Sequence, residues 1–288
     1  MGSAAKLRFI VVLLCFTVFS AQNLTTFTGT YGPFDKTIYS EFEFVGAASV
    51  SNDALQLTPD SGSGNQLLKP LGMLQNQSGR VMLKQPFKLW DYEINHNYDN
   101  GRVASFNSSF LINVYALNNI TVGEGLAFVV APDLGIPSGS YGQYLGLTNY
   151  NSDGNPVNQL VAVELDTFKE EFDLDANHVG LNINSIVSNI TTALTPRGIE
   201  IASKDEVRFY NVWVQYDGVK KFIEVYMERQ VVWKGQTPWE GQTPPRPPTP
   251  VLKADLDLRA VVAQHSYFGF SGSTGSAVQL NCLLRDGI

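Results

Sequence analysis

Apolar and polar residues alternate along most of the chain with a period of two, which is the pattern of half-buried β-strands. Glycine, asparagine and aspartate separate the alternating runs and mark turns at 99–101, 152–155 and 217–218. No window keeps a helical period. Many short strands at regular spacing predict an antiparallel β-sandwich. The clearest strand patterns cover residues 40–46, 109–117, 126–130, 160–168, 206–216 and 220–227.

One segment breaks this alternation. Residues 235–250 read GQTPWEGQTPPRPPTP, a six-residue duplication that runs into a proline-rich stretch. Because proline has no backbone N–H to donate to a sheet, we expect an extended surface connector here. The alternative is a docking motif for proline-binding domains, whose members are mostly intracellular. The strand pattern resumes after residue 250, and no domain boundary is predicted.

The composition indicates one large domain without a basic partner surface. The chain has 288 residues, 44% of them hydrophobic, which is enough for one β domain with a sizeable core. Its formal net charge is −7 and no basic cluster occurs. The sequence therefore argues against nucleic acid or an anionic membrane surface as a partner.

The N-terminus has the organisation of a secretory signal peptide. Lys6 and Arg8 precede an apolar run at 9–19, and Ser20 and Ala21 offer small residues for cleavage. A membrane anchor is the alternative, but the run is shorter than the roughly 20 residues that span a bilayer. We expect a signal peptide at 1–21, one domain at 22–288, no transmembrane segment, and a secreted, extracellular protein (apoplast or cell wall in a plant).

Cysteine and asparagine residues carry two further expectations for a secreted chain. Cys15 falls in the predicted signal peptide, so Cys282 has no partner for an internal disulfide. Its apolar surroundings predict a buried, inert thiol; a reactive thiol or an intermolecular bridge is the alternative. Five Asn-X-Ser/Thr sequons predict surface positions that can be glycosylated: Asn23, Asn76, Asn107, Asn119 and Asn189.

The most informative segment is VAVELDTFKEEFDLDANHVGLNINSI, residues 161–186. Glu164 and Asp166 are two apart in a strand pattern, so their side chains face one way, roughly 6.6 Å apart along the strand. Asp173 and His178 follow after a short acidic loop. Carboxylates facing one way are costly unless a cation lies between them, and this set suits divalent cations. The alternative is a solvated acidic loop beside a hydrogen-bonded core histidine.

This segment resembles the metal-binding signature of the legume-type (L-type) lectins. Further stretches resemble other strands and turns of that family, namely 123–132, 144–149, 212–218 and 267–275, so that the resemblance extends from Thr26 to about Leu284. The extracellular lectin domains of plant receptor-like kinases are the most similar group. The resemblance implies an all-β antiparallel jelly-roll sandwich, the concanavalin A-like lectin fold, with one flatter and one curved sheet.

The resemblance also implies a site for two ions. Glu164 and His178 would hold Mn²⁺, and Asp166 and Asp173 would bridge it to Ca²⁺. The backbone carbonyl of Phe168 and the side chain of Glu170 would complete the Ca²⁺ shell.

Two features of the loop depart from the family pattern. The loop between Asp166 and His178 is two residues shorter than usual. Asp173 keeps the family's spacing to His178, whereas Asp175 keeps the family's spacing to Asp166, so Asp175 remains an alternative to Asp173 as the metal ligand. Glu170 replaces the usual Asn and can only offer oxygen, without an NH₂ group for a sugar hydroxyl.

The positions that contact sugar in this family are also changed. Glu124 stands where the family has an Asp, Gln143 stands where it has a Gly, with Gly142 beside it, and Phe168 is placed to stack on a pyranose. The family Asp often follows a cis peptide bond, here Gly123–Glu124. The alternative interpretation of Glu124 is an ordinary surface carboxylate at a turn.

Three functions remain open from the sequence. The first is a non-catalytic protein that binds glycans or glycoproteins with Ca²⁺ and Mn²⁺ ordering its loops. The second is a lectin-fold scaffold or coreceptor that has lost sugar binding and recognises a protein or an apolar ligand. The third is a glycoside hydrolase using Glu164 and Asp166. His96 and His265 have no acidic or nucleophilic residue at a spacing typical of catalytic sites. The sequence leaves open whether two copies form a homodimer through their flat sheets.

Overall fold

The structure is a computed structural model that describes residues 26–60, 69–91, 101–116, 122–203, 206–233, 235–238 and 240–287. The predicted signal peptide, His96, and the sequons at Asn23 and Asn119 lie outside these ranges. Within them, none of the helices has the length and apolar character needed to cross a bilayer.

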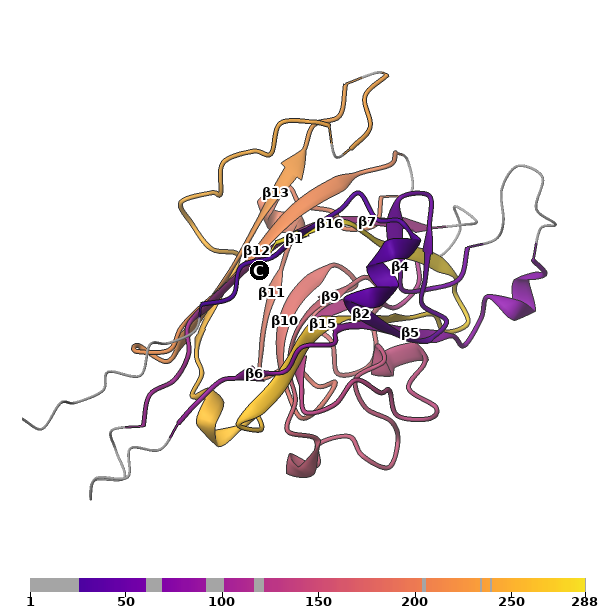
Figure 1. Ribbon diagram of the computed structural model, residues 1–288. Helices are drawn as coiled ribbons and strands as arrows, with labels where there is room; N and C mark the ends of the chain where they lie inside the picture. Colours follow the sequence, from indigo (N-terminus) through magenta and orange to yellow (C-terminus); the bar gives the residue numbers. More distant parts are fainter. Residues whose placement is uncertain are drawn as a thin grey trace, which may run out of the picture.

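Two antiparallel sheets make up the domain (Figure 1). The back sheet has the order β14-β13-β12-β7-β16-β4-β3, with β1 also paired to β16, and the front sheet has the order β11-β10-β9-β8-β15-β5-β2, with β6 also paired to β15. The strands are β1 Thr30–Tyr31, β2 Phe42–Gly46, β3 Ser49–Ser51, β4 Ala54–Gln56, β5 Ser78–Leu83, β6 Phe87–Lys88, β7 Phe106–Ala116, β8 Gly125–Ala131, β9 Val161–Asp166, β10 His178–Ile183, β11 Ile190–Ala193, β12 Phe209–Asp217, β13 Phe222–Gln230, β14 Leu252–Asp255, β15 His265–Ser273 and β16 Gln279–Gly287.

Helical structure is limited to short 3-10 turns in the described residues. They are Lys36–Ser40, Leu71–Met73, Gly142–Tyr144, Pro156–Asn158, Thr195–Arg197 and Leu258–Ala260. All six strand patterns found in the sequence correspond to strands β2, β7, β8, β9, β12 and β13. The prediction of an all-β antiparallel sandwich is therefore confirmed.

The core lies between the sheets because each strand turns its apolar alternate positions inward. Phe110 of β7 in the back sheet packs on two residues of the front sheet, Phe128 and Phe270. The ring centroids are 6.0 Å apart for the Phe110–Phe128 pair and 4.9 Å for the Phe110–Phe270 pair. Such aromatic pairs help to hold the two sheets together.

Cys282 and the proline-rich segment behave as the sequence predicts. Cys282 is buried and unpaired, in a cluster with Ala54, Leu111 and Leu284, and burial raises the pKa of its thiol.

The described part of residues 235–250 contains no strand and leaves the sandwich beside β13 (Figure 1). Arg246 of this segment lies 4.0 Å above the ring of Tyr226 and holds the segment against the back sheet.

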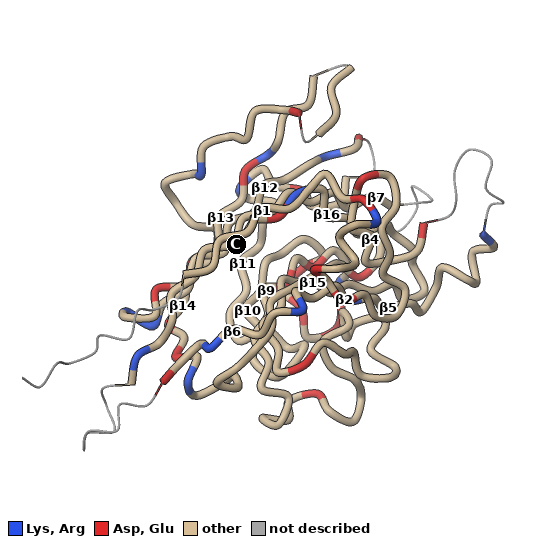
Figure 2. The backbone as a smooth tube through the Cα atoms, in the orientation of Figure 1, with Lys and Arg blue, Asp and Glu red and all other residues tan. Residues whose placement is uncertain are grey.

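Charged residues do not form a basic face in the described part of the chain. Figure 2 shows the Lys and Arg positions scattered along the backbone, whereas several acidic positions come together near β9 and β15. The chain carries 27 acidic and 20 basic residues, so an acidic gathering, rather than a basic one, is the feature to explain.

Candidate metal centre and adjoining loops

Strand pairing in the front sheet brings the predicted ligands together. Glu164 and Asp166 lie on the same face of β9, and β10 places Gly180 opposite Glu164 and His178 opposite Asp166. Gly180 leaves the space that the Glu164 carboxylate and the Ser188 hydroxyl occupy, since a Cβ atom there would collide with both. The alternation of β9 and the register of β10 therefore build the centre of the site.

Glu164 is almost completely buried, with 2% of its surface exposed, and its carboxylate accepts several hydrogen bonds. Asn182 Nδ2 donates to Oε2 at 2.8 Å, and the Ser188 hydroxyl donates to Oε1. His178 Nε2 lies 3.3 Å from Oε1. These partners hold the carboxylate in one orientation.

His178 is fully buried and has two differently used ring nitrogens. Nδ1 lies 2.9 Å from the backbone carbonyl of Asp175, which can only accept, so Nδ1 carries a proton there. Nε2 is then directed to Glu164 and, at 4.0 Å, to Asp173 Oδ1. A backbone carbonyl that fixes one nitrogen while the other faces carboxylates is the usual arrangement of a metal-binding histidine.

The structure separates the two rival aspartates of the loop. Asp166, Asp173 and His178 offer ligand atoms that all lie within 4.8 Å of one another, a set that can hold a metal ion. The Asp175 carboxylate lies 3.6 Å from Nδ1, on the other edge of the ring, and its side chain is 35% exposed. Asp173 is therefore the member of the cluster, and Asp175 supports His178 from outside.

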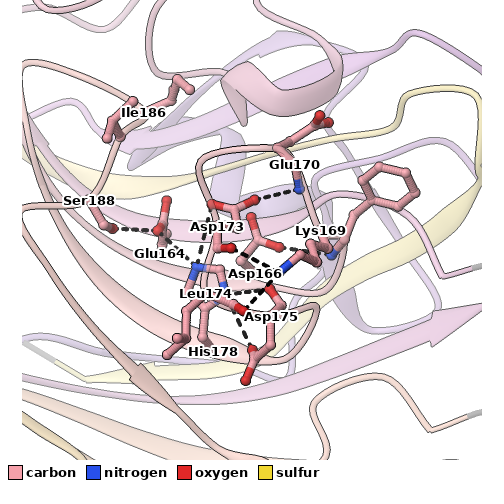
Figure 3. Close-up of polar contacts among 12 residues, drawn as sticks. Glu164, Asp166, Lys169, Glu170, Asp173, Leu174, Asp175, His178, Ile186 and Ser188 are labelled. Carbon is pink, nitrogen blue, oxygen red and sulfur yellow. Dashed lines mark hydrogen bonds and ion pairs between the residues drawn. The ribbon is translucent and has the colours of Figure 1, made fainter.

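Backbone amides and a lysine shape the loop between β9 and β10 (Figure 3). Phe168 N–H donates to Asp166 Oδ1 at 2.8 Å, and Glu170 N–H donates to Asp173 Oδ2 at 2.7 Å. Lys169 Nζ donates to the carbonyls of Asp173 and Leu174. The loop is closed by its own polar groups, with little apolar packing to hold it.

The carboxylates of this region repel one another. Burial, followed by the charges of Glu164 and Asp173, raises the pKa of Asp166 well above its ordinary value. Burial also raises the pKa of Asp173 and of Glu170. Burial alone would lower the pKa of His178, but its hydrogen bond to Glu164 and the charge of that residue raise it overall. The cluster attracts positive charge, and its oxygen and imidazole donors fit divalent cations.

Glu170 occupies a different place from the one that the sequence resemblance implies. Its backbone amide points to Asp173, while its carboxylate extends away from His178 and Asp166 (Figure 3). It nevertheless lies near enough to Glu124 for its charge to raise the pKa of that residue. In this conformation Glu170 belongs to the rim of the site.

Glu124 precedes β8 and is held from both sides. Its backbone carbonyl accepts from Thr167 N–H at 3.1 Å, while the Thr167 hydroxyl donates to the Gly123 carbonyl at 2.7 Å. The residue is 5% exposed, and burial, with the charges of Glu170 and Asp173, raises its pKa to about 7. Glu124 is therefore a buried acid beside the cluster, and its interpretation as an exposed surface carboxylate is wrong.

The expected cis peptide bond before Glu124 is not present. Among the described residues the cis bond is Gly32–Pro33, and the Gly123–Glu124 bond is trans. Thr167 and Gln279 hold the segment in this form, Gln279 through its Oε1 atom, which accepts from Gly123 N–H at 2.8 Å.

The 142–143 loop lies beside the turn that follows β15. Gly142 N–H donates to the Thr274 carbonyl at 3.1 Å, and the Ser273 hydroxyl donates to the Gly142 carbonyl at 2.6 Å. Gly275 in the same turn touches Glu124, since a Cβ atom at this position would collide with the Glu124 carboxylate. The structure thus brings Glu124 and the 142–143 loop together around residues 273–275.

Phe168 lies beside a cavity of about 710 Å³ next to the metal loop. The apolar part of its wall includes Val122, Ile199 and Ala202, and the charged residues of the wall are Lys169, Glu200 and Arg208. The sequence did not indicate this cavity, because one side of it is formed by residues 195–202, which have no recognisable motif.

Three supporting residues of the cluster were also missed by sequence reasoning. Asn182 and Ser188 bind Glu164, and Gly180 makes room for it. The signal for two of them was available: positions 178, 180 and 182 alternate in β10 and must share a face with Glu164 and Asp166. His265 is exposed at the start of β15.

Comparisons with known proteins agree with this architecture. The legume lectin domain profile matches residues 26–285. The probable L-type lectin-domain containing receptor kinase S.5 of Arabidopsis thaliana is 36% identical over 233 residues, which cover 80% of this chain and 31% of the kinase. The chain thus spans about a third of the length of the curated relatives it matches.

Two solved structures of similar fold are lectins. Lectin I-B4 of Griffonia simplicifolia, in a metal-free form, superposes with a TM-score of 0.69 at 26% identity and covers 91% of this chain and 98% of its own. The lectin UEA-II, in complex with galactose, gives a TM-score of 0.67 at 27% identity and covers 91% of this chain and 97% of its own.

Proposed function

Because this chain belongs to the legume lectin domain family, we propose that it is an extracellular, non-catalytic protein that binds carbohydrate. Binding would occur at the loops that surround the acidic cluster, with Glu124, Gly142, Gln143, Phe168 and Glu170 as the residues nearest the sugar. Glycans or glycoproteins would be the partners. The galactose complex of UEA-II and the receptor kinases of Arabidopsis support this proposal by similarity.

The acidic cluster would hold Ca²⁺ and Mn²⁺. Glu164, Asp166, Asp173 and His178 are the proposed ligands, and bound ions would neutralise carboxylates that otherwise repel one another. The Phe168 carbonyl is a further proposed ligand. The ions would also stiffen a loop that is closed by a few polar contacts only.

One observation carries this proposal. The described part of the chain gathers buried carboxylates around the Nε2 atom of a buried histidine, whose Nδ1 is fixed by a backbone carbonyl. A pair of catalytic acids in a glycosidase must reach the substrate, whereas Glu164 is buried and accepts three hydrogen bonds or close polar contacts. This environment favours ion binding over the glycoside hydrolase hypothesis.

A glycan array with secreted protein tests the proposal. We expect binding to a subset of glycans that is lost on dialysis against EDTA and restored by Ca²⁺ with Mn²⁺. Asn107 lies on the back sheet, away from the site, so Asn107→Gln is a matched control that should bind as the wild type does. Absence of any glycan binding by metal-replete, folded protein would contradict sugar recognition.

A second candidate function is recognition of an apolar ligand or a protein without sugar binding. The cavity beside Phe168 favours it, because its wall is largely apolar and it opens next to the same loops. An apolar fluorescent probe such as anilinonaphthalene sulfonate tests it. Under this alternative the probe binds the wild type, Ile199→Glu abolishes its signal, and no glycan competes for it.

A further inference from the structure

The sequon at Asn76 lies next to the proposed carbohydrate site, although the two are far apart in the sequence. Asn76 is exposed and precedes β5, with Gln77 and Ser78 completing the acceptor sequence. Its backbone has a positive φ of 52°, the left-handed conformation that asparagine tolerates in turns. The residue therefore presents its side chain at the surface.

Residues 75–77 are joined to the turn after β15 by a series of hydrogen bonds. Asn76 N–H donates to the Gly275 carbonyl at 3.1 Å, and Gln75 Nε2 donates to the Ser276 carbonyl at 2.7 Å. Gln77 N–H donates to the Thr274 hydroxyl at 3.1 Å. The two segments are held in a fixed position relative to each other.

The same turn touches the proposed sugar-binding residues on its other side. Gly275 lies directly against the Glu124 carboxylate, and the Thr274 carbonyl accepts from Gly142 N–H at 3.1 Å. One turn of backbone thus lies between Asn76 and both Glu124 and Gly142, a separation of two strand spacings, roughly 10 Å. An attached oligosaccharide is longer than this separation and can reach across it.

The other sequons in the described residues have different positions. Asn107 is on β7, where it pairs with Gln215 in the back sheet. Asn189 follows Ser188 at the edge of the front sheet and hydrogen-bonds its backbone to Leu181. Asn76 is the described sequon whose backbone contacts the turn that flanks Glu124 and Gly142.

We propose that an N-linked glycan on Asn76 covers the carbohydrate site and regulates access to it. This inference rests on the proposed function for its biological meaning, but the covering itself depends only on the position of Asn76. Because the glycan is tethered, its sugars have a high effective concentration at the site and compete with external ligands. The form without this glycan has the open site.

Thiol labelling measures the covering without requiring that the site binds sugar. The protein is secreted from a eukaryotic host, and peptide mass spectrometry reports the occupancy of Asn76. A Gln143→Cys variant then places a thiol at the site, and Cys282 does not interfere because it is buried. We expect a polyethylene glycol maleimide to label this thiol severalfold more slowly when Asn76 carries its glycan than in the Asn76→Gln background.

The Asn107→Gln background is the matched control, and it should leave the labelling rate unchanged. Equal rates with and without the Asn76 glycan, or a mass spectrum that shows Asn76 unmodified in secreted protein, would overturn the proposal. A glycan array then separates the two claims. Stronger binding by Asn76→Gln supports both claims, whereas slower labelling of the glycosylated form with no array binding retains the covering and rejects sugar recognition.

Discussion

The front and back sheets both bury carboxylates, but they surround them differently. At the front sheet, Glu164 of β9 accepts hydrogen bonds from Asn182 and Ser188, and Asp173 of the loop between β9 and β10 accepts one from a backbone amide. In the back sheet, Asp286 of β16 is fully buried, and neither of its oxygens meets a hydrogen-bond partner of normal geometry. The neighbouring Arg285 binds Asn211 instead.

This difference indicates what each region can do with its charge. The front-sheet carboxylates share a histidine and lie under a surface loop, so a cation can neutralise several of them together. Asp286 pairs in register with Tyr31 and Phe110, and within the described residues it belongs to no such group of metal-binding side chains. The first region is suited to a cation, whereas in the second region the uptake of a proton removes the cost of the buried charge.

The largest effect is expected at Asp286. Burial raises its pKa from 3.8 to about 7, although the nearby Gly287 amide and Ser108 hydroxyl act in the opposite direction. A raised acid pKa favours the folded state at low pH, and this advantage is lost as the pH rises from about 4 to about 7. This difference in pKa corresponds to a loss of roughly 4 kcal/mol in the free energy of unfolding, at 1.36 kcal/mol per pKa unit.

Asp286→Asn removes this titration, so the stability of the variant relative to the wild type should increase across that pH range and stay constant above it. Urea unfolding of both proteins in EDTA at several pH values measures the difference. Burial of the new amide changes the free energy of unfolding by an amount that is independent of pH. The quantity to compare is therefore the slope of the free energy of unfolding against pH. If the free energies of unfolding of the two proteins change in parallel with pH, the pKa of Asp286 is not raised by folding, and this prediction is wrong.

The next effect distinguishes the two aspartates of the metal loop. Asp173 belongs to the group around His178 Nε2, so Asp173→Asn should weaken Ca²⁺ and Mn²⁺ binding by at least about 100-fold. This loss exceeds the one expected for a residue that only hydrogen-bonds to a metal ligand. Asp175 supports His178 from the Nδ1 side, mainly through its carbonyl, so Asp175→Asn should change affinity by less than about tenfold. Isothermal titration calorimetry measures both. The reverse order would place Asp175 in the site.

The smallest effect concerns the rim. The Glu170 carboxylate extends away from the cluster, so Glu170→Asn should leave the metal content unchanged. The new amide adds a donor for a sugar hydroxyl, which is worth about 1 kcal/mol, or roughly fivefold in glycan affinity. Array binding together with elemental analysis tests this. A loss of bound metal in this variant would show that Glu170 is itself a ligand.

The sequence predicts the fold and the centre of the site well, because both depend on period-two alternation. Glu164 and Asp166 face one way for the same reason that the core strands are recognisable. The choice between Asp173 and Asp175 lies in an irregular loop, where spacing does not determine direction. The trans bond before Glu124 and the outward Glu170 carboxylate depend on loop contacts with Thr167 and Asp173.

Asp286 shows a different limit of sequence reasoning. The register of β16 against β7 shifts between Leu283 and Arg285, which changes the face on which the following residues lie. Simple alternation cannot locate such a bulge, so the sequence gives no sign that an aspartate enters the core. The cavity beside Phe168 escaped prediction for a related reason, since irregular turns form much of its wall.

Metal content and thermal stability, measured together, test the central claim most directly. Secreted protein is dialysed extensively, analysed by elemental mass spectrometry, and then melted with and without EDTA. We expect stoichiometric calcium and manganese. With each ion added back at a hundredfold excess over its Kd, each site stabilises by about 2.7 kcal/mol, so chelation of both ions should lower the Tm by roughly 10–20 °C for a domain of this size. Protein without either ion, and with a Tm that EDTA leaves unchanged, would contradict the account.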